Sequence, residues 1–154
     1  MSLYPVFEAL EATPVGAAIK ESVWLFPAIE AVHLLALATL GGAVLMLDLR
    51  LLGLGLTGQP VATVERDSRP WLIGAVAAMI LTGSLLGVSE AVKLYDKQAF
   101  WVKMIALAAA LLFTFAVKAP LARRGPNRLA APVAVVSLAL WLTVAIAGRW
   151  IGFS

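Results

Sequence analysis

The sequence predicts an all-α membrane protein in which four transmembrane helices form one bundle, preceded by a short amphipathic helix at the membrane interface. Of the 154 residues, 62% are hydrophobic and 14% are charged, whereas a soluble domain is about half apolar and about a quarter charged. Residues 129–148 and 71–89 form runs of twenty and nineteen residues without a charge. Each run can cross a hydrocarbon core about 30 Å thick at about 1.5 Å per residue. We therefore expect a single membrane domain over residues 1–154.

The interfacial helix is predicted at about residues 3–12. Its apolar residues follow the i, i+3, i+4, i+7 spacing of an amphipathic helix that lies along a membrane surface: Leu3, Val6, Phe7 and Leu10. Thr13, Pro14 and Gly16 then interrupt the helical pattern. The first twenty residues lack a basic start and a continuous apolar core, so we expect the spans themselves to direct insertion into the membrane.

The four transmembrane spans are predicted at about residues 27–50, 71–91, 100–118 and 129–151. Pro27 fits the first turn of the first helix, and Pro70 is expected to open the second. In the third span only residues 104–117 are free of charge. We expect Lys103 and Lys118 to extend this span by directing their side chains outward from its two ends.

Lysine and arginine are unevenly divided between the two sides of the predicted bundle. Seven of the twelve fall in the loops after the first and third spans: Arg50, Arg66, Arg69, Lys118, Arg123, Arg124 and Arg128. Cytoplasmic loops carry an excess of basic residues, so we expect these two loops in the cytoplasm and both termini on the outer side. The same bias accounts for the net charge of +3 without a nucleic-acid partner.

Asp48 and Arg50 are expected to form a solvated exit from the first span. Glu30 and Asp48 are eighteen residues apart, about 27 Å along a helix, which places them near opposite membrane faces. Glycines recur over residues 53–58, so we expect a turn there, with Arg50 as an orientation anchor.

A cluster of polar residues is predicted at the outer end of the bundle, around the single histidine of the chain. His33 lies one helical turn inside Glu30, on nearly the same face of the first span. The other three spans bring charged residues to the same level: Glu90, Lys103 and Arg149. Ionisable groups at membrane depth are costly and tend to mark function. A structural interpretation stays open, with a histidine hydrogen bond between helices and the ion pairs Glu90–Lys103 and Glu30–Arg149.

His33 is also a candidate ligand for haem iron or copper, because neutral imidazole binds both metals. Depth selects Met104 as the second ligand: Met46 is thirteen residues from His33, about 20 Å along the same helix, and Met79 is also too deep. For haem b or copper, His33 with Met104 is therefore the two-ligand site that the monomer offers, unless a homodimer brings two copies of His33 together. The absence of cysteine excludes thiolate metal sites and c-type haem.

Two GxxxG pairs lie near the same end of the predicted bundle, Gly83 with Gly87 and Gly148 with Gly152. Small residues at this spacing let helices pack closely, and close packing is the favoured interpretation. The same glycines would also let a flat macrocycle approach the backbone.

Several motifs resemble an uncharacterised bacterial family of small four-helix membrane proteins. They include AIEAVHLL at residues 28–35, LDLRLLG at 47–53, FWVK at 100–103 and GRWI at 148–151. The resemblance covers most of the chain and implies the four-helix fold, but no established activity. The first motif is also distantly similar to the membrane domain of copper resistance protein D. That similarity implies copper or haem handling at the outer face, with His33 as the matching residue.

Three function classes remain open for a protein of the bacterial inner membrane with both termini in the periplasm. The first is a haem- or copper-binding module for redox chemistry or metal handling. The second is a non-catalytic accessory subunit that joins a larger membrane complex or a homo-oligomer. The third, a transporter or channel, is disfavoured because the predicted spans are continuous and uncharged at their centre. No catalytic constellation is evident, which favours a protein that is not an enzyme.

Overall fold

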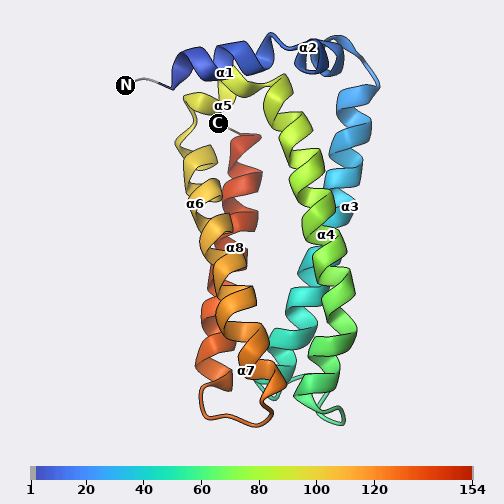
Figure 1. The fold of residues 1–154 in the computed structure, drawn as a ribbon, viewed down its shortest axis with the longest axis vertical. Coiled ribbons are helices and arrows are strands. Elements are labelled where there is room, and N and C mark those ends of the chain that lie inside the picture. Colours follow the sequence, from blue (N-terminus) through green and yellow to red (C-terminus); the bar gives the residue numbers. More distant parts are fainter. Residues whose placement is uncertain (1–2, 154) are drawn as a thin grey trace.

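The computed structural model describes residues 3–153, and this part of the chain forms helices and no strands. Four long helical stretches run along the long axis of the molecule (Figure 1). They are α3 (Leu25–Leu51), α4 (Val61–Ser89), a continuous stretch made of α6 (Gln98–Phe113), η1 (Thr114–Lys118) and α7 (Ala119–Arg123), and α8 (Ala130–Ile151). All four are long and apolar enough to span a membrane, which confirms the all-α class with four candidate spans.

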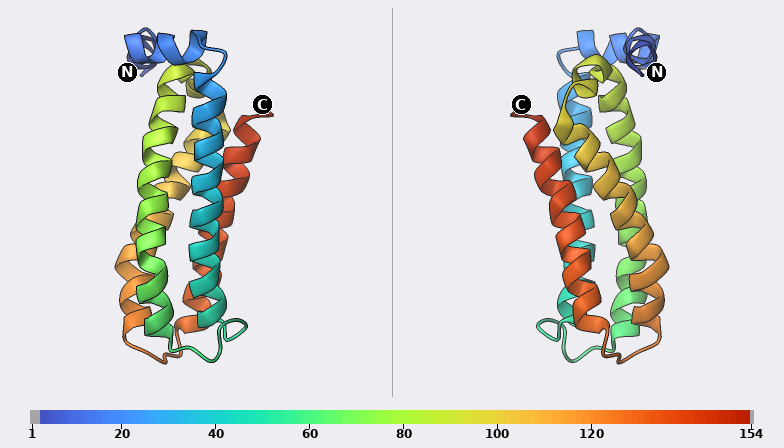
Figure 2. Two further views of the ribbon diagram at one scale, coloured as in Figure 1. Left: turned by 90° about the vertical axis from the view of Figure 1, so that its right-hand side faces the viewer. Right: turned by 90° about the vertical axis from the view of Figure 1, so that its left-hand side faces the viewer.

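The two ends of the molecule differ. The short helices α1 (Tyr4–Glu11), α2 (Pro14–Glu21) and α5 (Ala91–Tyr95) lie at one end, near the C-terminus (Figures 1 and 2). We call this the termini end. The opposite end carries the connections 52–60 and 124–129, and we call it the loop end.

The long helices pack mainly as two pairs, α3 against α4 and α6 against α8, and α3 also contacts α8. The middle of the bundle is filled by an apolar core: Leu40, Ala43, Val44, Leu72, Ala75, Ala106, Ala110, Trp141 and Val144. A second core lies nearer the loop end: Leu47, Leu51, Val64, Ala122 and Ala134. Small residues in both cores let the helix backbones approach closely, which matters in lipid because packing there is not driven by the exclusion of water.

The second span, α4, begins at residue 61 instead of residue 71, and Pro70 lies inside it. A proline in a helix interior removes one backbone hydrogen bond and costs about 3 kcal/mol. The added turns offset this cost because they bring Val64 into the core near the loop end, pair Glu65 with Arg123 and contact α7. The prediction that Pro70 opens the helix is therefore wrong. The charged residues before it belong to a helix that continues past the apolar span.

The third span ends in a π-helical segment, η1, placed directly before Pro120. The amide of Ala119 donates to the carbonyl of Thr114, one residue further back than in an α-helix. A proline ring collides with the carbonyl four residues before it, and widening the preceding turn relieves such a conflict. Thr114 and Lys118, at the two ends of this segment, are both buried.

The residues after Thr13 form a second short helix, α2, where the sequence pattern predicts only an interruption. The Thr13 hydroxyl accepts a hydrogen bond from the amide of Gly16 at 3.2 Å, and Pro14 takes the first helical position, which needs no amide donor. A Cβ atom on Gly16 would lie 2.8 Å from the carbonyl oxygen of Glu11 and 3.1 Å from that of Val88. Gly16 thus allows α1, α2 and α4 to meet at a sharp corner.

Aromatic rings attach α1 to the start of the third span. The ring of Phe7 packs against Tyr95, Phe100 and Trp101, with centroid distances of 5.2, 6.3 and 6.0 Å. The indole nitrogen of Trp101 donates to the carbonyl of Tyr95 at 3.0 Å. Of the apolar stripe predicted for the first helix, Phe7 packs against α5 and α6, whereas Leu3, Val6 and Leu10 are exposed.

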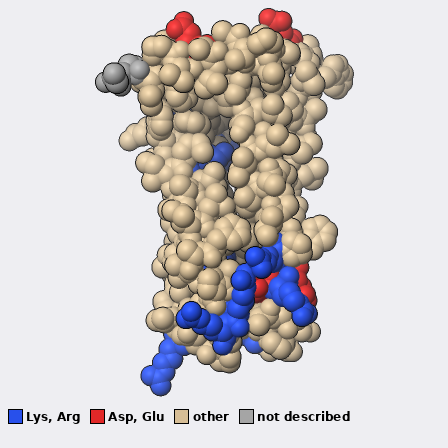
Figure 3. Space-filling model, in the orientation of Figure 1, with Lys and Arg blue, Asp and Glu red and all other residues tan. Residues whose placement is uncertain are grey.

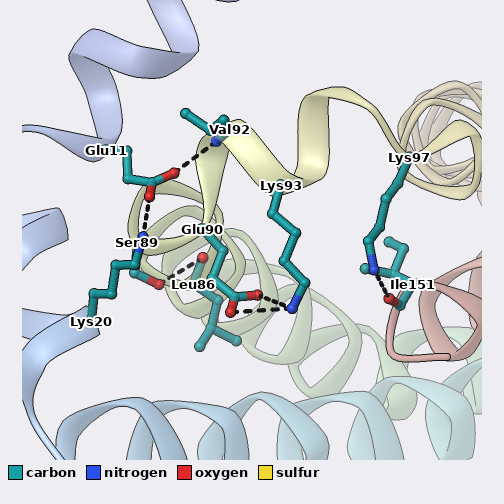
Figure 4. Close-up of polar contacts among 9 residues, drawn as sticks. All are labelled: Glu11, Lys20, Leu86, Ser89, Glu90, Val92, Lys93, Lys97 and Ile151. Atoms are coloured by element: carbon teal, nitrogen blue, oxygen red, sulfur yellow. Dashed lines mark hydrogen bonds and ion pairs between the residues drawn. The ribbon is translucent and has the colours of Figure 1, made fainter. Parts of the chain in front are cut away.

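Glu11 joins α1 to both α2 and α5. One carboxylate oxygen accepts a hydrogen bond from the amide of Val92 at 2.8 Å, and the other pairs with Lys20 (Figure 4). The amide of Val92 lies in the first turn of α5, where backbone donors have no helical acceptor. The ammonium of Lys20, and then this amide, lower the pKa of Glu11 below its usual value of 4.5.

Replacing Glu11 with glutamine is expected to loosen the short helices at the termini end. Glutamine keeps the size of the side chain but loses the charge that Lys20 and the Val92 amide bind. We expect the Val92 amide to exchange hydrogen on the order of tenfold faster at neutral pH. Because the folded-state pKa of Glu11 is lowered, its contribution is full above the unfolded pKa and is lost as pH falls through the folded-state value.

Hydrogen exchange of the detergent-solubilised protein from pH 7 down to pH 3 would test this. Glu8→Gln is the matched control, because Glu8 is an exposed acidic residue of the same helix. An equal effect of both substitutions on Val92 would contradict a specific role for Glu11.

Candidate functional site

His33 lies in α3 toward the termini end and is hydrogen-bonded to α4. Its Nδ1 atom is 2.7 Å from the hydroxyl oxygen of Thr82, and that hydroxyl donates to the carbonyl of Ala78 at 2.6 Å. A hydroxyl has only one proton to donate. With that proton donated to Ala78, Thr82 accepts from Nδ1–H, and Nε2 of the neutral imidazole keeps its lone pair. Among residues 3–153, no hydrogen bond uses this Nε2 atom.

The imidazole lies directly on the backbone of α4 at Gly83. A Cβ atom on Gly83 would be 3.2 Å from Cε1 of His33, closer than ordinary van der Waals contact. Any larger residue at this position would push the ring away. The space at Gly83 is thus used by the histidine ring.

Lys103 brings the third span into the same region. Its side chain lies against Gly148 of α8, where a Cβ atom would be 3.5 Å from Cε and 3.6 Å from Nζ. The ammonium is also near enough to His33 to interact with it electrostatically. Within the described residues 3–153, Lys103 forms neither an ion pair nor a side-chain hydrogen bond.

Together these residues form what we call the His33 site: His33, Thr82, Gly83, Lys103 and Gly148. All four long helices contribute to it. Figure 3 shows basic side-chain atoms inside a hollow in the half of the molecule nearer the termini end, between the helices that Figure 1 labels α4 and α6. The site therefore combines a nitrogen lone pair with an ammonium group below the short helices.

The other residues predicted for this cluster have different surroundings. Glu90 pairs with Lys93 at 3.3 Å instead of with Lys103 (Figure 4). The guanidinium of Arg149 lies 4.4 Å above the ring of Phe153. Glu30 is exposed and forms no ion pair among residues 3–153. The predicted ion pairs Glu90–Lys103 and Glu30–Arg149 therefore do not form among residues 3–153.

Met104, Gly87 and Gly152 lie outside the His33 site as defined above. Met104 is next to Lys103, but its side chain is 38% exposed, so its pairing with His33 stays a prediction. A Cβ atom on Gly87 would be 4.0 Å from a Leu94 methyl group, and one on Gly152 would be 3.5 Å from the carbonyl of Arg149.

A second polar cluster, which the sequence analysis does not predict, lies buried toward the loop end. Lys118 donates to Asp48 at 3.0 Å and to the hydroxyl of Ser137 at 2.8 Å. Ser137 in turn donates to the second oxygen of Asp48 at 2.8 Å. The side chains of Lys118 and Asp48 are 1% and 0% exposed. This buried triad joins α3, η1 and α8.

Asp48 is therefore not part of a solvated exit, and Lys118 does not extend outward from its span. Both predictions are wrong because the third span continues to Arg123 and Ser137 of α8 packs against both side chains. Asp48 and Lys118 thus lie inside the bundle. The sequence did contain a signal for this pair, because Asp48 and Lys118 carry opposite charges and lie at the same end of two spans.

Two further contacts support the buried triad. The indole nitrogen of Trp141 donates to the hydroxyl of Thr114 at 3.1 Å, which ties α8 to η1. Arg123 pairs with the buried Glu65 at 2.9 Å, which ties α7 to α4. No buried side-chain nitrogen or oxygen of the described residues lacks a hydrogen-bond partner. The loop end is therefore cross-linked by satisfied polar contacts.

Comparison with known proteins gives one match. A model described as "Family of unknown function (DUF6644)" matches residues 7–154. No curated protein and no solved structure matches the chain. These findings agree with the predicted membership of an uncharacterised family, and they give no link to copper resistance protein D.

Replacing Lys118 with methionine is expected to destabilise the protein by about 3–5 kcal/mol, because Asp48 is left as a buried charge without its partner. Combining Lys118→Met with Asp48→Leu removes both charges, and we expect it to recover most of that loss. Thermal unfolding in detergent, followed by circular dichroism, measures both effects.

Arg66→Met provides the control for this experiment. The pair of Arg66 with Asp67 is 77% and 65% exposed, and exposed pairs contribute about 1 kcal/mol or less. A Lys118→Met variant as stable as Arg66→Met would show that the buried triad does not hold the bundle together.

Proposed function

The chain belongs to the DUF6644 family of unknown function, and from that premise we propose that it is a bacterial cytoplasmic-membrane protein that binds haem b at the His33 site. In this proposal Nε2 of His33 would bind the haem iron. The observation that carries it is the hydrogen-bond chain from His33 through Thr82 to Ala78. Histidines that bind metals usually donate the other ring N–H to a fixed acceptor, which sets the ring orientation.

Two features of the His33 site fit haem. Nε2 offers one uncommitted nitrogen, and a single histidine suffices as the protein ligand of a haem iron. The ammonium of Lys103 has no acidic partner among residues 3–153 and can pair with a haem carboxylate. Gly83 keeps the imidazole close to α4. When bound, haem would supply one-electron redox chemistry.

Copper fits the site less well. The described residues contain no group of three or more His, Cys, Asp or Glu side chains placed to hold a metal ion. Copper would have to rely on His33 with Met104 alone. In the haem proposal Met104, or His33 of a second copy, would supply a second ligand to the iron.

The charge distribution supports an orientation with the loop end in the cytoplasm. Most of the basic side chains visible in Figure 3 gather at the loop end, where some acidic ones also lie, whereas the charged side chains visible at the outer edge of the termini end are acidic. Because cytoplasmic loops carry the excess of Lys and Arg, both termini would then lie in the periplasm. The His33 site would lie nearer the periplasmic face.

Absorption spectra of the purified protein, oxidised and then reduced with dithionite, test the haem proposal. We expect sharp bands that shift on reduction and disappear in His33→Ala. Thr82→Val removes the acceptor of Nδ1–H and should lower haem retention roughly tenfold.

Thr39→Ala is the matched control for these spectra. Thr39 is an exposed residue of α3, the helix that carries His33, and its hydroxyl donates to the backbone carbonyl of Leu35. We expect it to leave the haem bands unchanged. A wild-type spectrum that contains only tryptophan and tyrosine absorption would overturn the proposal and favour the accessory-subunit alternative. Copper that is retained without haem bands and lost in His33→Ala would favour metal handling.

Cysteine labelling tests the orientation, because the chain has no cysteine of its own. Thr57 and Asp96 are exposed, at the loop end and the termini end respectively. With a membrane-impermeant maleimide on intact spheroplasts, Asp96→Cys should react at once and Thr57→Cys only after permeabilisation. The reverse pattern would invert the proposed orientation.

A further inference from the structure

A groove lies on the surface of the loop end, beside the π-helical segment. It has a volume of about 250 Å³. Its lining is Ala116, Val117, Pro120, Leu121, Arg124, Asn127 and Leu129. The groove thus runs from the end of the third span to the start of α8, and none of its lining residues is acidic.

The two parts of this groove differ in chemistry. The part formed by η1 and α7 is apolar, and Val117 there is 42% exposed. Ala116 and Pro120 add little side-chain volume, so the surface is hollowed at this point. The other part lies in the connection to α8 and carries the polar side chains of Arg124 and Asn127. A molecule bound in the groove would therefore contact an apolar surface along one part and polar side chains along the other.

The polar part has unused donors for an anion. Arg124 is exposed and forms no ion pair or side-chain hydrogen bond within residues 3–153, whereas the neighbouring Arg123 is paired with Glu65. The side-chain oxygen of Asn127 accepts from the amide of Leu129 at 2.9 Å. The remaining polar group of Asn127 is its NH₂, which can only donate. Arg128 adds a further exposed positive charge beside the groove.

We propose that this groove binds one acidic phospholipid, with the phosphate at Arg124 and Asn127 and an acyl chain along Ala116, Val117 and Pro120. Basic pockets between spans at the cytoplasmic side are suited to anionic headgroups. A free phosphate would use only the polar part and would leave the apolar wall unexplained. The proposal rests on the proposed orientation of the four spans, with the loop end in the cytoplasm, and is independent of haem binding at the His33 site.

Lipid retention by the purified full chain tests this proposal. The protein is equilibrated in mild detergent with phosphatidylglycerol or phosphatidylcholine, and bound lipid is counted by native mass spectrometry. We expect one retained phosphatidylglycerol and no comparable retention of phosphatidylcholine. Arg124→Gln should weaken phosphatidylglycerol retention about fivefold, the effect expected for one basic residue near an anionic lipid, and Asn127→Ala should weaken it further.

Two matched variants distinguish lipid binding in the groove from a general attraction of acidic lipid to basic residues. Arg66→Gln removes an equal charge at the same end but outside the groove, and it should leave retention unchanged. Ala116→Leu fills the apolar part without changing any charge, and it should lower retention. An equal loss in Arg66→Gln and Arg124→Gln would overturn the proposal.

Inorganic phosphate distinguishes a lipid from a simple anion. Competition by millimolar phosphate together with normal retention in Ala116→Leu would show an anion site that does not bind the acyl chain, and would also overturn the proposal. Circular dichroism confirms that each variant is folded before lipid is counted.

Discussion

The buried contact of Lys118 with Asp48 and Ser137 fixes how the two helix pairs meet. A charge in a membrane interior is tolerated only when it is paired and hydrogen-bonded, so Lys118 and Asp48 must stay together for either to remain buried. The contact also depends on η1, because the π-helical turn before Pro120 carries Lys118. The resulting triad ties α3 to α8 and to the third span. The register of these three helices is therefore set at the loop end.

This asymmetry explains where the His33 site forms. The loop end is closed by the triad, by Trp141 with Thr114, and by Arg123 with Glu65. The termini end is covered by short helices, through Glu11 and the rings around Phe7. Between the two polar regions lies the apolar core around Leu40 and Val144. The described residues of that core are uncharged, which does not favour a proton path between the two ends.

The spans could be predicted because twenty-residue uncharged runs have few alternatives to a membrane-spanning helix. The extra helical turns before Pro70 could not be predicted. A proline ordinarily marks the start of a helix, and here tertiary contacts with α7 outweigh that local preference. Asp48 and Lys118 were placed at the surface for a related reason. A charge near the end of a span is ordinarily solvated, and only the packing of a third helix that carries Ser137 shows otherwise.

His33 and Lys103 could be singled out from the sequence because isolated ionisable groups are conspicuous in an apolar chain.

The two polar clusters differ in how fully their bonding capacity is used. In the buried triad, both oxygens of Asp48 accept hydrogen bonds and the ammonium of Lys118 has two partners. At the His33 site, only Nδ1 is engaged, while Nε2 and the ammonium of Lys103 have no partner among residues 3–153. Neither atom is buried, because every buried side-chain nitrogen and oxygen of the described residues has a hydrogen-bond partner. Both can therefore bind water or a ligand. Thr82 orients the imidazole and joins α3 to α4, as the structural interpretation of this histidine predicts. The proposed ligand would use the capacity that remains at the His33 site, whereas the buried triad has a structural role.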